Sequence, residues 1–151
     1  MATILGIDYG KRHIGIAISD EMQKLASPLT SLSTKRGKDP ASLIEAIVLL
    51  IKTHGVGEIV VGMPINMDGT RGPQADEVAR FAKKLGVATM LPVNGVDERL
   101  TTWEAEQQLK EAGLSAAKRR EVIDQAAAVL ILQQYLDRQT RPNDVTARLE
   151  E

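Results

Sequence analysis

The order of its apolar segments is the feature of this sequence that most constrains the fold. Two short apolar runs, at 3–9 and 13–20, are separated by a three-residue link that begins at Gly10, which predicts a β-hairpin with a glycine at its turn. A weaker run at 28–33 predicts a third strand. Because only short links join these three strands, we expect them to be antiparallel.

In the rest of the chain, segments whose apolar residues recur at helical spacing alternate with short continuous apolar runs, which predicts helices alternating with strands. Since a helix precedes each later strand, we expect those strands to be parallel to one another. The sequence therefore predicts an α/β fold with a mixed five-stranded sheet, three antiparallel strands followed by two parallel ones, flanked by helices. The expected later elements are a helix from Pro40 to His54 closed by Gly55, a strand at 58–62, a helix from Pro73 to Gly86, a strand within 87–96, a short helix from Thr101 or Thr102 to Leu109, and a long helix from Ser115 to about Leu136.

The chain has the size and composition of one globular domain. It contains 151 residues, of which 43% are hydrophobic, and 19 Lys+Arg against 20 Asp+Glu give a net charge of −1. We expect a single domain over 1–137 and a polar tail over 138–151. A near-zero charge argues against a broadly basic protein that coats nucleic acid or membranes. One Trp, two Tyr and one Phe are too few for a base-stacking platform.

Composition also restricts the chemistry and the compartment. The sequence has no cysteine, which excludes a thiol nucleophile, a disulfide scaffold and a zinc site built on cysteine. The longest apolar run, 126–132, is far shorter than the roughly 20 residues that span a bilayer. The N-terminus enters a strand pattern without a basic leader segment. We therefore expect a soluble, cytoplasmic protein with no membrane partner.

Acidic residues follow two of the predicted strands. Asp8 lies at the end of the first apolar run, where a carboxylate is costly to desolvate unless it is paired or bound to a metal. The alternative is a strand-end Asp that accepts hydrogen bonds from the turn after it. Asp97 and Glu98 follow the last strand, at the end where open α/β sheets place their ligands. Their alternative is a surface pair that precedes a helix.

A further acid, Asp124, lies on an apolar face of the long last helix. The residues three, four and seven positions later are Ala127, Ala128 and Ile131. The alternative to a functional role is an ion pair with a basic residue on a neighbouring element. Three clustered acids repel one another unless cations neutralise them, and oxygen ligands suit Mg²⁺ or Mn²⁺. Two such ions about 4 Å apart can support the hydrolysis of a phosphodiester.

Four short motifs occur in a fixed order between residues 4 and 136. They are Gly-Ile-Asp-Tyr-Gly at 6–10 with the segment 15–20, Val-Gly-Met-Pro through Asp-Gly-Thr-Arg-Gly at 61–72, Val-Asp-Glu-Arg-Leu-Thr-Thr at 96–102, and Ile-Asp-Gln-Ala-Ala-Ala at 123–128. Each motif is weak by itself, but the four together are specific. On these motifs the sequence resembles the YqgF-type (RuvX-like) family of nucleases, which have a ribonuclease-H-like fold.

The resemblance implies that Asp8, Glu98 and Asp124 are the catalytic, metal-binding acids, with Mg²⁺ or Mn²⁺ as cofactor. It implies a nuclease that processes the 5′ end of pre-16S ribosomal RNA, with resolution of four-way DNA junctions as the alternative. The implied partners are structured RNA, branched DNA, and the ribosome or its precursors. Better-known bacterial resolvases have a fourth acid about one turn along the last helix, whereas this chain has alanines there. Three ligands therefore remain, with Asp97 as a candidate auxiliary.

Four basic residues near these motifs are candidates for contacts with substrate phosphates: Lys11, Arg12, Arg71 and Arg99. The segment 64–72, followed by Pro73 at a helix start, could offer backbone N–H groups to a phosphate, or could simply be a turn-rich connection. A non-catalytic RNA- or ribosome-binding module is a remote alternative, because such a module gains nothing from three acids in apolar settings. An actin-like ATPase or sugar kinase is disfavoured, because the chain has no second glycine-rich phosphate hairpin.

Overall fold

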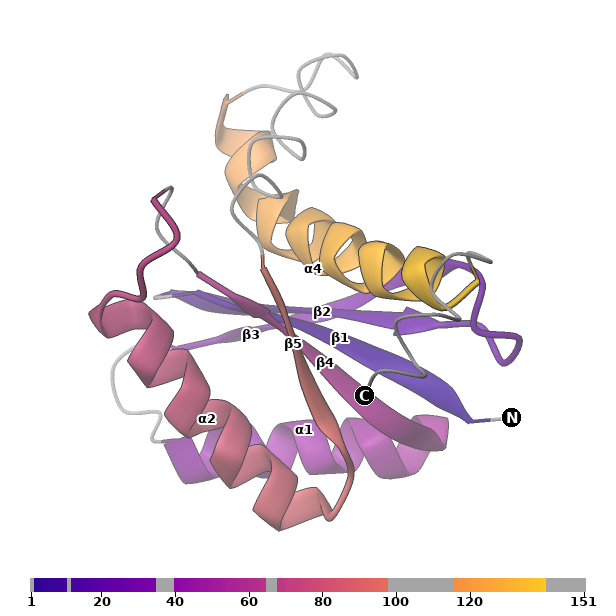
Figure 1. Cartoon of the computed structure of the whole chain (residues 1–151). Helices are drawn as coiled ribbons and strands as arrows, with labels where there is room; N and C mark the ends of the chain where they lie inside the picture. The colour runs from indigo at the N-terminus through magenta and orange to yellow at the C-terminus, as the bar shows by residue number, and fades with distance from the viewer. Residues whose placement is uncertain (1, 11, 35–39, 65–67, 98–115, 141–151) are drawn as a thin grey trace.

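The computed structural model describes residues 2–10, 12–34, 40–64, 68–97 and 116–140, and only the backbone of 40, 116–124 and 140. Its elements follow the predicted order of strands and helices (Figure 1). They are β1 (Thr3–Tyr9), β2 (His13–Ser19), β3 (Ala26–Ser33), α1 (Pro40–His54), β4 (Val56–Met63), α2 (Pro73–Thr89), β5 (Val93–Asp97) and α4 (Ala116–Thr140). The short helix predicted from Thr101 or Thr102, the cap at Ser115 and the end of the tail lie outside the described residues.

The five strands form one mixed sheet in the order β3-β2-β1-β4-β5. β1 pairs with β2, and β2 with β3, in antiparallel fashion, whereas β1, β4 and β5 are parallel. The predicted sheet of three antiparallel and two parallel strands is therefore confirmed. β1, the central strand, is held by hydrogen bonds on both edges.

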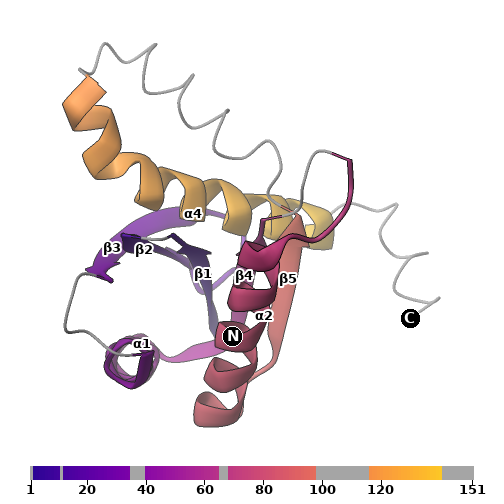
Figure 2. The same ribbon diagram turned by 90° about the vertical axis from the view of Figure 1, so that its left-hand side faces the viewer.

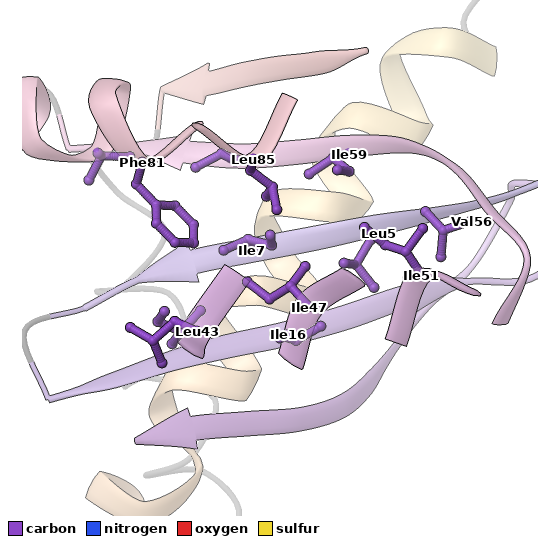
Figure 3. Packing of buried hydrophobic residues seen from close by; sticks show 13 residues of the cluster. Leu5, Ile7, Ile16, Leu43, Ile47, Ile51, Val56, Ile59, Phe81 and Leu85 are labelled. Carbon is purple, nitrogen blue, oxygen red and sulfur yellow. The ribbon is translucent and has the colours of Figure 1, made fainter. Parts of the chain in front are cut away.

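Helices cover both faces of this sheet. α1 and α2 lie on one face and α4 crosses the other, as the two perpendicular views show (Figures 1 and 2). Alternate residues of each strand therefore enter two separate cores. The larger core, beneath α1 and α2, is shown in Figure 3 and includes Leu5, Ile7, Ile16, Leu43, Ile47, Ile51, Val56, Ile59, Phe81 and Leu85. The core beneath α4 contains Ile4, Ala17, Val60, Val96, Ala128, Ile131, Leu132 and Leu136.

The helix ends show where local sequence signals succeed and fail. Gly55 follows α1 with φ of +62°, which confirms the predicted left-handed cap. Gly86, by contrast, does not end α2 as predicted. The helix continues to Thr89, and Met90 takes the left-handed position with φ of +58° while its N–H donates to the Gly86 carbonyl at 2.8 Å. The strand predicted within 87–96 accordingly begins only at Val93.

α4 continues one turn beyond the predicted end near Leu136, to Thr140. The helix therefore includes the first three residues of the expected polar tail, 138–140. None of the helices in the described part of the chain is long and apolar enough to cross a membrane.

Ser19 is the one buried polar side chain among those that the structure describes. Its hydroxyl accepts a hydrogen bond from the Ile4 N–H at 2.8 Å and donates to the Asp20 carbonyl at 2.9 Å.

We expect Ser19→Ala to lower the free energy of unfolding by about 1–3 kcal/mol, because a buried N–H loses its acceptor. Urea unfolding measures this change. Ser27→Ala, at an exposed position on β3, is the control, and equal losses for both variants would contradict the prediction.

Candidate active site at the ends of the parallel strands

The carboxyl ends of β1, β4 and β5 meet at one edge of the sheet. Ile7 of β1 pairs with Val61 of β4, and the next residue of β4 pairs with Val96 of β5. Asp8, the residue after Ile7, therefore lies level with the last residues of β4 and, one strand further along the sheet, of β5. This edge is where open α/β sheets place their ligands.

Asp8 is directed to the face of the sheet that α4 covers. A Cβ built on Gly6 would lie 2.7 Å from the Cβ of Leu132, so that side of β1 faces α4. Side chains two residues apart on a strand share a face, which places the Asp8 carboxylate on this same side. Asp8 is half-buried, whereas Ile4, on the same face of β1, is fully buried. The carboxylate thus lies where the apolar layer beneath α4 meets solvent.

The N-terminal half of α4 extends toward the same edge. Its C-terminal half is fixed at the opposite edge, where Gln133 accepts a hydrogen bond from the Ala26 N–H and donates to the Lys24 carbonyl, each at 2.9 Å. Tyr135 donates to Glu58 near the start of β4. Residues before Ala128 therefore lie toward the end of β1, and the backbone of Asp124 is one turn before Ala128.

The predicted acids are only partly within the described residues. The structure places the Asp8 side chain and the backbone of Asp124 at one edge, whereas the Asp124 side chain and the whole of Glu98 lie outside the description. Asp97 is the last residue of β5, paired with Met63 and exposed. Within the described side chains there is no group of three His, Cys, Asp or Glu that could hold a metal ion, but only Asp8 of the predicted three belongs to that set.

Tyr9 connects the end of β1 to α2 on the other face of the sheet. Its hydroxyl donates to Glu77 Oε1 at 3.4 Å, and its ring centroid lies 4.6 Å from that of Phe81. Burial, and then the nearby Glu77 carboxylate, raise the pKa of the Tyr9 phenol. The contact holds the first turns of α2 beside the edge that contains Asp8. Sequence analysis missed this role, because nothing local marks a partner 68 positions away.

Two of the four predicted phosphate contacts lie in the described part of the chain. Arg12 is exposed at the turn between β1 and β2. Arg71 precedes α2, with its Nη2 atom 3.9 Å from Asp76 Oδ1 and both side chains more than half exposed. An ion pair this exposed contributes little to stability, so Arg71 remains able to bind another anion. Lys11 and Arg99 lie outside the described residues.

Residues 68–72, which lead into α2, form a turn held by side-chain hydrogen bonds. Asp68 Oδ1 accepts hydrogen bonds from the hydroxyl and the N–H of Thr70, at 2.6 and 2.9 Å, and these bonds lower the pKa of Asp68. Gly72 is the N-cap of α2 and provides no side-chain cap. The prediction of backbone N–H groups available to a phosphate stays a prediction.

Solved structures define the fold class. Thermus thermophilus RuvC in complex with a Holliday junction substrate superposes with a TM-score of 0.57 at 13% identity, covering 92% of this chain and 96% of RuvC. The fowlpox virus Holliday junction resolvase gives a TM-score of 0.55 at 11% identity, covering 89% and 98%. The fold is therefore the ribonuclease-H-like fold of RuvC-type resolvases, as predicted.

Sequence comparison gives the family. A family model described as RuvX, Holliday junction resolvase, matches residues 2–138. A protein of Pelotomaculum thermopropionicum named "Putative pre-16S rRNA nuclease" is 50% identical over 139 residues, 92% of this chain and 89% of the relative. A Chloroflexus aurantiacus protein of the same name is 48% identical over 141 residues, 93% and 90%. The chain belongs to the RuvX family. It is a nuclease, a hydrolase that acts on phosphodiester bonds.

Proposed function

We propose that this nuclease hydrolyses phosphodiester bonds at the 5′ end of precursor 16S ribosomal RNA, with Asp8, Glu98 and Asp124 as its catalytic acids. The relatives that share about half of their residues with this chain are named for that substrate. The observation that supports the site most directly is Asp8 itself. It is a half-buried carboxylate at the end of the central strand, on the face of the sheet that α4 covers. The N-terminal half of α4 extends toward the same edge of the sheet.

The proposed residues fit a divalent metal site. All three donors are carboxylates, and hard oxygen ligands suit Mg²⁺ or Mn²⁺. Asp8 is half-buried, and a bound cation would stabilise a carboxylate in that setting. When bound, such ions activate a water molecule and stabilise the leaving oxygen. Asp8 is well suited to hold an ion in place, because β1 is paired on both sides and cannot easily shift.

The basic side chains at the same edge would bind and orient the substrate. Arg12 at the turn between β1 and β2 and Arg71 before α2 are exposed. We propose that they contact phosphates on either side of the scissile bond, together with Lys11 and Arg99. These contacts would position the RNA without reading its sequence. The proposed substrate places the enzyme in the cytoplasm, with ribosome precursors as its partner.

Resolution of four-way DNA junctions is the second candidate function. The description of the matching family model, Holliday junction resolvase, favours it. The acids would perform the same chemistry on DNA, since hydrolysis involves only the phosphodiester. Symmetric cleavage of a junction ordinarily requires a two-fold dimer, so a strictly monomeric enzyme would count against this function.

The test compares two substrates under three metal conditions. A precursor 16S RNA 5′ segment and a four-way DNA junction are each incubated with the enzyme in Mg²⁺, Mn²⁺ or EDTA, and cleavage is followed on gels. We expect metal-dependent cleavage of the RNA, weak or no cleavage of the junction, and no cleavage in EDTA. Preferential cleavage of the junction would establish the second function instead. Full activity in EDTA would contradict the metal mechanism.

A further inference from the structure

We propose that Gly6 is a positioning residue of the active site. Because Gly6 has no side chain, α4 can lie directly on β1, and this contact sets the separation between Asp8 and the helical turn that contains Asp124. The inference deepens the proposed function and rests on it. It concerns a residue two positions before Asp8 that touches neither substrate nor metal.

α4 approaches β1 more closely than any other residue at position 6 would permit. A Cβ on Gly6 would lie 2.7 Å from the Cβ of Leu132 and 3.2 Å from the backbone oxygen of Ala128. Neither atom can rotate away, because one is fixed to the helix backbone and the other belongs to it. Ala128 and Leu132 are also fully buried. Any side chain at position 6 must therefore move the helix or the strand.

The strand is the less able of the two to move. Gly6 is paired with Ala17 of β2 on one side and with Val60 of β4 on the other, in the centre of the sheet. The helix would therefore be displaced. Carbon atoms in contact prefer separations of roughly 3.5–4.0 Å, so relief of a 2.7 Å contact requires a displacement of about 1 Å.

The displacement would fall mainly on the half of α4 that contains Asp124. The other half is held at the opposite edge of the sheet by the two hydrogen bonds of Gln133 to the turn between β2 and β3 and by the bond from Tyr135 to Glu58. Asp124 lies on the far side of Gly6 from these anchors. Catalytic groups have to be held within about 0.5 Å of their productive geometry, so a displacement of this size matters for the reaction.

The experiment compares Gly6→Ala with Gly57→Ala. Gly57, near the start of β4, is a matched control because its Cβ would meet the Ala2 Cβ at 2.6 Å, a comparable clash that involves no atom of α4. For wild type and both variants we would measure the urea midpoint, Mn²⁺ binding by the EPR signal of the free ion, and kcat and KM for the cleaved substrate.

We expect Gly6→Ala to weaken Mn²⁺ binding by about 10–100-fold and to lower kcat by about 100-fold with little change in KM. Gly57→Ala should leave Mn²⁺ binding and kcat close to wild type even if it lowers the urea midpoint equally. A purely structural role for Gly6 would instead give the same pattern in both variants, and this result would overturn the inference.

A second variant keeps the test decisive if Gly6→Ala does not fold. Ala128→Val adds volume to a fully buried position on the helix side of the same contact, and should weaken Mn²⁺ binding in the same direction. Unchanged Mn²⁺ affinity in folded Ala128→Val would also overturn the inference. Failure of the proposed function is distinguishable, because then the wild-type enzyme itself would show neither metal-dependent cleavage nor Mn²⁺ binding.

Discussion

Asp8→Asn is expected to lower the rate of cleavage by at least about 1000-fold while leaving the fold intact. The substitution removes one negative charge and a strong metal donor, and charge stabilisation by bound ions provides several kcal/mol of the catalytic effect, about one factor of ten per 1.4 kcal/mol. Asn has nearly the shape of Asp, and the strand pairing of position 8 with Gly15 does not depend on which of the two side chains is present. Single-turnover cleavage in Mg²⁺, together with the urea midpoint, measures both parts of this prediction.

The matched control for this experiment is Asp20→Asn. Asp20 follows β2, antiparallel to β1, and so lies at the opposite edge of the sheet from Asp8. Its Oδ1 accepts hydrogen bonds from the N–H groups of Lys24 and Leu25, at 2.7 and 3.1 Å, and the amide oxygen of Asn can accept the same bonds. We expect cleavage by Asp20→Asn to match that of the wild type.

The two other proposed acids should behave as Asp8 does. Glu98→Gln and Asp124→Asn are expected to lower the cleavage rate about as much as Asp8→Asn does, because the three acids act as one unit. For the same reason their effects should not add, and the triple variant should be little worse than Asp8→Asn alone. Bound Mn²⁺ should also raise the melting temperature of the wild type more than that of each variant. Cleavage that survives all three substitutions would refute the assignment of the site.

The sheet was predictable from the sequence because its signals are local. The glycine-containing link after Tyr9 specifies a hairpin, and a helix between two apolar runs specifies parallel strands, whatever the rest of the chain does. Asp8 became a candidate for a similar reason, since a carboxylate that ends an apolar run is unusual by itself, and its catalytic role stays a prediction. These predictions needed no knowledge of which distant residues come into contact.

The features that the sequence did not reveal depend on contacts between distant segments. Gly86 was expected to stop α2, but Leu85 is fully buried in the core and the helix retains its hydrogen bonds beyond the glycine. Burial of that face outweighs the roughly 1 kcal/mol cost of an interior glycine. The approach of α4 to Gly6 likewise joins residues more than 120 positions apart. In the sequence Gly6 is only a small residue in a strand.

Phe81→Ala is expected to lower the free energy of unfolding by about 3–5 kcal/mol, because a buried aromatic ring is replaced by a cavity. Phe81 is 4% exposed in the core beneath α1 and α2 and also supports the ring of Tyr9. At about 2–4 °C per kcal/mol for a chain of this size, the melting temperature should fall by roughly 10 °C. Differential scanning calorimetry and urea unfolding measure the two quantities.

The same variant separates the stability of the fold from the geometry of the site. Phe81 lies on the face of the sheet opposite to Asp8, so Phe81→Ala should retain most of its cleavage rate well below its melting temperature, unlike Gly6→Ala. Val87→Ala, on the same helix but 74% exposed, is the control and should change stability by no more than about 0.5 kcal/mol. Equal stability losses for Phe81→Ala and Val87→Ala would contradict the packing described for α2. A large loss of kcat in folded Phe81→Ala would show instead that both faces of β1 set the position of Asp8.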